Sequence, residues 1–192
     1  MYERDTIAAI ATPPGQGGVA IIRVSGPQAE TVACQVFVLA QPSERLRSRR
    51  LYFGRIIDPF TSSPLDQGFL VLMRAPRSYT GEDIAEIHCH GGSLLSRRIL
   101  AAVLSQGVRL ALPGEFTKRA FLNGRIDLSQ AEAVLDLIQA KNDKGLSLAW
   151  EHLSGRLSAA CTSIRERLLG LTAYLEAFID FPEEDLPERT QA

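Results

Sequence analysis

Hydrophobic and polar positions follow two different patterns along the chain. Residues 1–120 contain short runs that are β-branched or alternate between apolar and polar, which favours strands. Between them lie runs with apolar residues three and four apart, which favour helices. The expected strands are 5–12, 19–25, 51–58, 66–73, 83–89 and 108–112, and the expected helices are 28–39 and 94–106.

This mixture predicts an α+β fold, in which a mixed β-sheet is combined with helices. The strands at 51–58 and 66–73 flank the turn-rich residues 59–64, so we expect them to form a hairpin. Residues 41–50 are polar and are expected to form a linker.

Residues 113–132 mark the change from the sheet pattern to the helical pattern. Pro113 is suited to the first turn of a helix, where its missing N–H is not needed. Asn123 and Gly124 both tolerate the left-handed conformation that ends a helix. A new helix is expected to start at Asp127 or at Ser129, since both are followed three residues later by a Gln or Glu that completes a capping box.

Residues 121–192 are expected to be helical and to form part of an all-α bundle. An amphipathic helix is predicted at 128–142 and a long helix at 144–181. The long helix has a seam of apolar residues at steps of three and four, which a single helix cannot bury. Partners for the seam must come from another chain, from the sheet part or from sequence beyond these residues. Residues 181–188 are acidic and interrupted by proline, which indicates a linker.

Composition narrows the class of protein further. The 192 residues are 45% hydrophobic, with a net charge of −1 and a pI near 6.3, so the overall charge does not indicate nucleic-acid binding. The polar N-terminus does not fit a signal peptide, and no apolar run is long enough for a membrane helix. Three separated cysteines without CxxC spacing fit reduced thiols, so we expect a cytoplasmic protein without a membrane partner.

Two motifs with possible chemistry are set aside. Residues 15–20 match the dinucleotide pattern GxGxxA, but a strand follows instead of the required helix, and no Walker A sequence occurs. This loop is either a tight glycine turn or a place where backbone approaches a flat ligand or a partner chain. His88 and His90 would need a third metal ligand, and we interpret them as structural or hydrogen-bonding residues. No metal site and no catalytic acid, base or nucleophile is predicted.

Three other features are candidates for binding. Arg23 interrupts an apolar strand, and is either a strand-end residue reaching solvent or a fixed guanidinium for a carboxylate. Tyr79 and Glu82 lie on one loop, and an aromatic ring beside a carboxylate suits a 2-aminopyrimidinone ring. A basic run is either a solvated linker or a contact for RNA phosphates; it comprises Arg45, Arg47, Arg49 and Arg50.

Several ordered motifs together resemble one family. They are 5–7, 12–18, 22–26, 79–83, 90–92, 113–132 and 177–184. Together they resemble the N-terminal part of the tRNA modification GTPase family MnmE, also called TrmE. The resemblance covers essentially all 192 residues.

The resemblance implies a domain organisation and ligands. Residues 1–120 would be an α/β domain related to the tetrahydrofolate-binding domain of aminomethyltransferases. This domain would bind 5-formyltetrahydrofolate or 5,10-methylenetetrahydrofolate and form a homodimer. Residues 121–192 would be the first helices of the helical domain. The family's G domain, which carries GTP, Mg²⁺ and K⁺, and its C-terminal cysteine motif are not in this sequence, so these residues alone are not expected to hydrolyse GTP.

The resemblance also implies site residues and a reaction. The family's folate contacts fall on Arg23, Glu82 and Arg125 of this sequence, where Arg125 stands at a position that is commonly lysine. The whole protein, with its FAD-containing partner MnmG, would modify C5 of the wobble uridine of tRNA. Two alternatives remain: a stand-alone folate-dependent protein like an aminomethyltransferase, and a purely structural dimerisation module.

Overall fold

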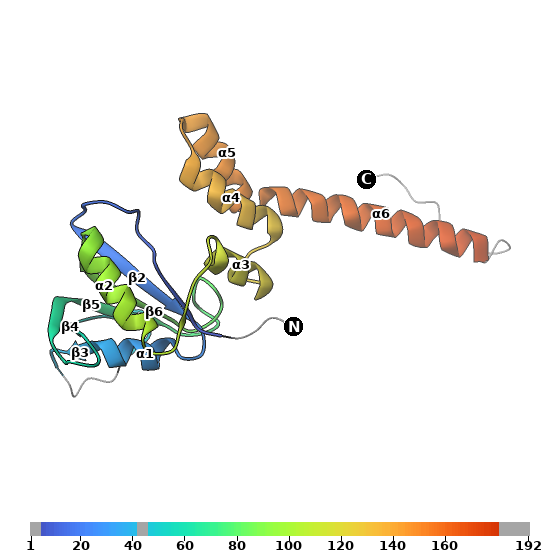
Figure 1. Cartoon of the computed structure of the whole chain (residues 1–192). Helices are drawn as coiled ribbons and strands as arrows, with labels where there is room; N and C mark the ends of the chain where they lie inside the picture. The colour runs from blue at the N-terminus through green and yellow to red at the C-terminus, as the bar shows by residue number, and fades with distance from the viewer. Residues whose placement is uncertain (1–4, 42–45, 181–192) are drawn as a thin grey trace. The chain divides into compact units, whose positions relative to one another are not determined.

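The structure is a computed structural model that describes residues 5–41 and 46–180. The chain divides into two compact units, residues 1–126 and 127–192 (Figure 1). Each unit has its own secondary structure: the first contains a sheet with helices, and the second contains helices in its described part.

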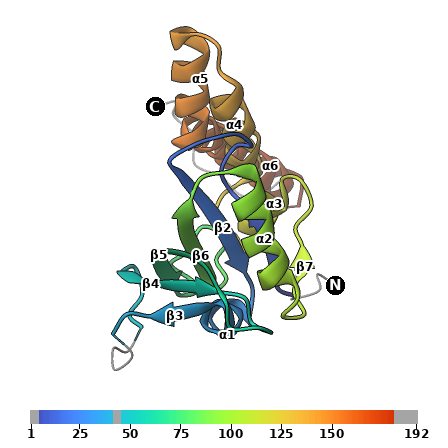
Figure 2. The same ribbon diagram turned by 60° about the vertical axis from the view of Figure 1, so that its left-hand side comes forward.

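The first unit contains a sheet of seven strands in its described residues (Figure 2). Their order is β3-β4-β5-β6-β2-β1-β7, and every neighbouring pair is antiparallel except β1 and β7, which are parallel. The predicted mixed sheet of an α+β fold is therefore confirmed, as is the hairpin formed by β4 and β5. The strands are β1 (Ile7–Ile10), β2 (Val19–Ser25), β3 (Phe37–Leu39), β4 (Leu51–Ile57), β5 (Pro64–Met73), β6 (Ile84–His90) and β7 (Arg109–Leu110).

The two faces of the sheet differ in burial. Helices α1 (Ala29–Val36) and α2 (Ser93–Leu104) cover one face, and the core lies between them and the strands. Ile22 and Ile87 of this face are completely buried. The opposite face carries the rings of Phe53 and Phe69, whose centroids are 5.5 Å apart and which are 51% and 45% exposed. Period-two alternation therefore places apolar side chains on both faces, and only one is covered by α1 and α2.

Antiparallel pairing brings the ends of several neighbouring strands together at one end of the sheet. Ser25, the last residue of β2, pairs with Ile7 at the start of β1 and with Ile84 at the start of β6. Ile84 also pairs with Met73 at the end of β5. Leu51, the first residue of β4, pairs with Val71 near the end of β5. Residues 5–6 before β1, the loop between β5 and β6 and residues 46–50 before β4 therefore lie at this end of the sheet, which we call the site edge.

The helix after β7 carries several side chains to this region. Helix α3 (Glu115–Leu122) begins after Gly114 and not at Pro113, because Gly114 adopts a left-handed φ of 74° as the N-cap. The predicted end at Asn123 and Gly124 is confirmed: the N–H of Asn123 donates to the carbonyl of Arg119, and Gly124 has a φ of 67°.

The second unit contains three helices in its described residues, α4 (Leu128–Gln139), α5 (Asp143–Leu153) and α6 (Arg156–Asp180). Of the two predicted starts, the structure uses Asp127, which forms a capping box with Gln130. The single long helix predicted at 144–181 is wrong, since the chain turns at Gly155, where φ is 83°.

The predicted apolar seam lies mainly on α6 and is exposed. Leu168, Leu171 and Leu175 are 58%, 49% and 57% exposed. Within the described ranges, none of the helices combines the length and the apolar character that crossing a bilayer requires. The linker predicted at 181–188 lies outside the described residues.

Candidate functional site

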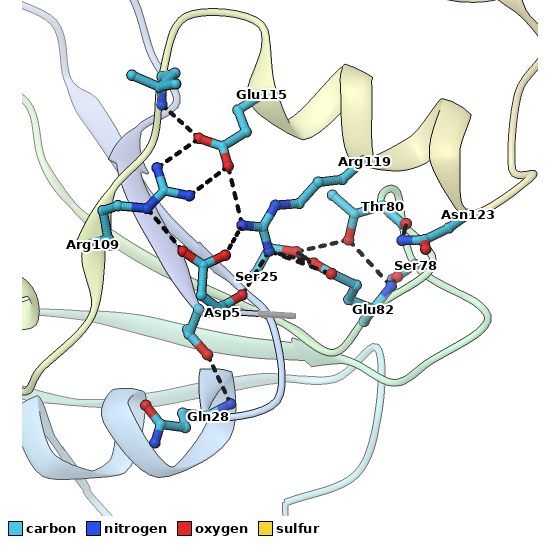
Figure 3. Close-up of polar contacts among 12 residues, drawn as sticks. Asp5, Ser25, Gln28, Ser78, Thr80, Glu82, Arg109, Glu115, Arg119 and Asn123 are labelled. Atoms are coloured by element: carbon cyan, nitrogen blue, oxygen red, sulfur yellow. Dashed lines mark hydrogen bonds and ion pairs between the residues drawn. The ribbon is translucent and has the colours of Figure 1, made fainter. Parts of the chain in front are cut away.

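The carboxylate of Glu82 lies at the site edge in contact with the side chains of Ser25 and Arg119 (Figure 3). The hydroxyl of Ser25 donates to Oε2 of Glu82 at 2.8 Å, and Nη1 of Arg119 lies 3.2 and 3.3 Å from the two carboxylate oxygens. The Glu82 side chain is 13% exposed. Because its partners come from β2 and α3, the position of this loop carboxylate depends on both elements.

Arg119 is the buried centre of a charge network. Its side chain is inaccessible to solvent, and its guanidinium pairs with Asp5 at 2.6 Å, with Glu115 at 3.1 Å and with Glu82. Arg109 of β7 binds two of the same carboxylates, Asp5 and Glu115, each at 2.8 Å. Charge-assisted hydrogen bonds of this kind orient both partners strongly. The network therefore joins β7, α3, the segment before β1 and the Glu82 loop.

The two arginines keep the neighbouring acids ionised. The hydrogen bond from Arg109 lowers the pKa of Glu115 from 4.5 to about 2, against the opposing effect of burial. The same arginine is the main cause that lowers the pKa of Asp5. Both carboxylates are therefore charged throughout the neutral and mildly acidic range.

Arg23 lies in the middle of a small aromatic and acidic cluster. Its Nε donates to Oε1 of Glu86, the residue opposite it on β6, at 2.7 Å. Its guanidinium carbon lies 5.5 Å from the centroid of the Tyr79 ring and 5.6 Å from that of Phe116. The Arg23 side chain is 27% exposed. The guanidinium is therefore held by Glu86 and remains partly accessible, and its role as a contact for a ligand carboxylate stays a prediction.

Arg125, which follows the C-terminal end of α3, contacts the loop that carries Tyr79. Its Nε donates to the carbonyl of Ser78 at 3.1 Å. A Cβ placed on Gly81 would lie 3.1 Å from Cγ of Arg125, so the side chain runs close over this glycine. Arg23 faces Tyr79 and Glu82 belongs to the loop, so the structure brings all three sequence-predicted residues to the loop 78–82.

The histidines have carboxylate partners. Nε2 of His88 lies 3.4 Å from Glu86, and Nδ1 of His90 lies 2.8 Å from Asp66. In the described ranges, no group of three or more His, Cys, Asp or Glu side chains is arranged to hold a metal ion. These contacts are the hydrogen-bonding role that the sequence suggested for both residues.

The glycine-containing loop of residues 12–17 lines a separate cavity. A cavity of about 610 Å³ lies between residues 12–17 and the start of α2, and none of the three predicted site residues lines it. A Cβ on Gly91 would lie 1.9 Å from the carbonyl oxygen of Gly17. The absence of a side chain at Gly91 therefore permits the close approach of the two backbones.

Sequence reasoning missed the residues that hold the site together. The spacing of Glu115 and Arg119 is that of a helical ion pair, which is a usable signal for this contact. No comparable signal links Arg119 to Asp5, 114 positions earlier, or Arg23 to Glu86. Those pairs require the register of the sheet and the docking of α3.

Comparison with known proteins assigns both units to the same kind of protein. Residues 6–125 match the family described as GTP-binding protein TrmE N-terminus, and residues 128–192 match the MnmE helical domain. The chain is 52% identical over 191 residues to the tRNA modification GTPase MnmE of Geobacter sulfurreducens, covering 100% of this chain and 42% of that protein.

Other relatives give the same result. The tRNA modification GTPase MnmE of Moorella thermoacetica is 54% identical over 182 residues, covering 94% of this chain and 39% of its own length. That of Chloroflexus aurantiacus is 52% identical over 188 residues, covering 98% and 41%. The chain therefore spans about two fifths of the length of these relatives.

Proposed function

Since this chain belongs to the MnmE family, of which it spans the N-terminal and helical regions, we propose that its first unit binds a reduced folate and forms a homodimer. The folate is a formyl- or methylene-tetrahydrofolate that acts as a one-carbon donor. In the whole protein, a tRNA modification GTPase, this donor serves the modification of C5 of the wobble uridine, in cooperation with the FAD-containing partner MnmG.

The arrangement around the loop 78–82 is the observation that carries the folate proposal. A pterin edge presents N–H groups that a carboxylate accepts, and the carboxylate of Glu82 is held in place while staying 13% exposed. The Tyr79 ring lies on the same loop, with the Arg23 guanidinium 5.5 Å from its centroid, and would contact the aromatic face of the pterin. Arg23 and Arg125 add two guanidinium groups to this loop for the carboxylate or formyl oxygens of the ligand.

The uncovered face of the sheet supports the homodimer. Phe53 and Phe69 form a tilted aromatic pair on it, and Leu51 on the same face is 54% exposed. Exposed apolar patches of this kind favour association with another protein surface. Burial of these side chains against a second copy would remove them from water.

Isothermal titration calorimetry with 5-formyltetrahydrofolate tests the ligand site. We expect saturable binding by the 192-residue chain and a loss of about 10- to 100-fold in affinity for Arg23→Ala and for Glu82→Gln, because hydrogen bonds to charged groups contribute about 1.5–3 kcal/mol. Arg165→Gln, an exposed change on α6, is the control and should bind like the parent chain. Absence of binding to a folded dimer would show that the site is assigned wrongly.

Sedimentation equilibrium tests the homodimer. We expect twice the chain mass of 21.0 kDa for the parent chain and a shift toward the monomer for Phe53→Asp, which places a charge on the uncovered face. Phe60→Asp is the matched control, because Phe60 is 77% exposed and belongs to the β4–β5 hairpin turn. Equal dissociation of both variants, or a monomeric parent chain, would refute the proposed interface.

A further inference from the structure

We propose that Ser25 and Thr80 are positioning residues of the candidate folate site, because their hydroxyls fix the direction in which the Glu82 carboxylate points. The inference rests on the proposed function, in which Glu82 accepts hydrogen bonds from the edge of a pterin ring. Ser25 and Thr80 are completely buried, so the role that we assign to them is exerted through Glu82 and not through contact with the ligand.

The three residues form a closed ring of hydrogen bonds (Figure 3). The backbone N–H of Glu82 donates to Oγ1 of Thr80 at 3.2 Å, the hydroxyl oxygens of Thr80 and Ser25 lie 2.7 Å apart, and the Ser25 hydroxyl donates to Oε2 of Glu82 at 2.8 Å. A carboxylate only accepts, and a hydroxyl carries one proton. The Ser25 proton is therefore directed to Glu82, and the Thr80 hydroxyl donates to Ser25.

Regular secondary structure holds both hydroxyls. Ser25 is the last residue of β2, and it is paired on both sides, with Ile7 of β1 and with Ile84 of β6. Thr80 is held from the end of α3, because Nδ2 of Asn123 donates to its carbonyl at 2.7 Å. Groups supported by strands and helices are positioned more precisely than groups on a loop alone. The ring therefore fixes the loop carboxylate relative to the sheet.

Packing alone does not require these two hydroxyls. Alanine at position 25 and valine at position 80 would have nearly the same shapes, and replacing both members of a buried hydrogen-bonded pair by apolar groups can leave stability almost unchanged. Arg119 approaches both oxygens of Glu82, at 3.3 and 3.2 Å, whereas the Ser25 hydroxyl contacts Oε2 at 2.8 Å. The Ser25 contact thus sets the rotation of the carboxylate, on which two parallel hydrogen bonds to a pterin edge depend.

Isothermal titration calorimetry of variants with 5-formyltetrahydrofolate tests this role. We expect Ser25→Ala and Thr80→Val each to lower the affinity about 10-fold, and Thr80→Ser, which keeps the hydroxyl, to stay within about 2-fold of the parent chain. Ser105→Ala and Thr172→Val are the matched controls, since each removes a hydroxyl that donates to a nearby backbone carbonyl, and both should bind like the parent chain. Urea denaturation establishes that each variant is folded, and the Thr80 pair decides the question if Ser25→Ala does not fold.

A double-mutant cycle separates positioning from a general effect on packing. If Thr80 acts through the carboxylate, Thr80→Val should change the affinity by less than about 2-fold in a chain that already carries Glu82→Ala. An independent effect on packing would lower the affinity about 10-fold in that background as well.

Three results would overturn the inference and leave the folate site in place. They are parent-like binding by both Ser25→Ala and Thr80→Val, equal losses in Thr80→Ser and Thr80→Val, and a full loss of about 10-fold from Thr80→Val in the Glu82→Ala background. Absence of folate binding by the folded parent chain is a different outcome, because it would refute the proposed function and this inference with it.

Discussion

Replacing Glu115 by Gln is expected to weaken the first unit in a strongly pH-dependent way. The variant keeps the shape of the side chain and removes the charge that faces Arg109 and Arg119. The pKa of Glu115 is lowered from 4.5 to about 2, chiefly by Arg109. At about 1.4 kcal/mol per pKa unit, this corresponds to about 3 kcal/mol. Because the Arg109 side chain is 45% exposed, solvent screening reduces the expected contribution to about 2 kcal/mol.

The sign of the effect follows from the lowered pKa. Folding favours the ionised carboxylate, so its stabilisation is complete above the unfolded-state pKa near 4.5 and is lost as the pH falls toward 2. The difference in the free energy of unfolding between the parent chain and Glu115→Gln should therefore be about 2 kcal/mol at neutral pH and approach zero near the folded-state pKa.

Urea denaturation at several pH values measures this difference. Fluorescence of the single tryptophan, Trp150, follows the second unit alone, and near-UV circular dichroism, to which the buried Tyr52 contributes, adds the signal of the first unit. Glu166→Gln, an exposed change on α6, is the matched control. A difference between Glu115→Gln and the parent chain that stays constant down to about pH 2.5 would refute the reasoning, because an ion pair must lose its effect there.

Two further substitutions and one labelling experiment test other parts of the structure. Asp127→Ala removes the capping box with Gln130 and should cost the second unit about 1 kcal/mol, seen as a lower urea midpoint; an unchanged midpoint would contradict this. Gly91→Ala should cost about 1–3 kcal/mol, because its Cβ would lie 1.9 Å from the Gly17 carbonyl oxygen; calorimetry should show a lower Tm, and an equal Tm would count against this close approach. Burial raises the pKa of Cys89 to about 11, so a thiol reagent should modify this cysteine only when the protein unfolds. The other two cysteines are exposed and should be modified in the folded protein. Rapid labelling of all three cysteines in the folded protein would contradict this prediction.

The chain's local patterns were enough for the fold class and for part of the candidate site. Alternation and β-branched runs predicted six of the seven strands described in the sheet, all except β3, and the capping residues near Asn123 and Asp127 predicted helix ends that the structure confirms. The loop with Tyr79 and Glu82 was also recognisable, since an aromatic and a carboxylate close in sequence suggest their chemistry without knowledge of the fold.

Local patterns predicted two element ends wrongly. The helix predicted at 28–39 ends at Val36, because residues 37–39 pair with β4 as strand β3. The apolar spacing continues through Gly155, yet the chain turns there into two helices. A helical period describes which residues share a face, and does not reveal where backbone hydrogen bonding stops.

The sequence by itself determined every strand except β3, the helix ends at Asn123 and Asp127, and the residue types that the candidate site requires. Only the tertiary structure decided that Arg119 joins Asp5, Glu115 and Glu82, and that Glu86 holds Arg23. These charged pairs join residues up to 114 positions apart, and they form only when the sheet register and the docking of α3 bring opposite charges within hydrogen-bonding distance. Local propensity carries no information on such distances, because it depends on neighbours along the chain.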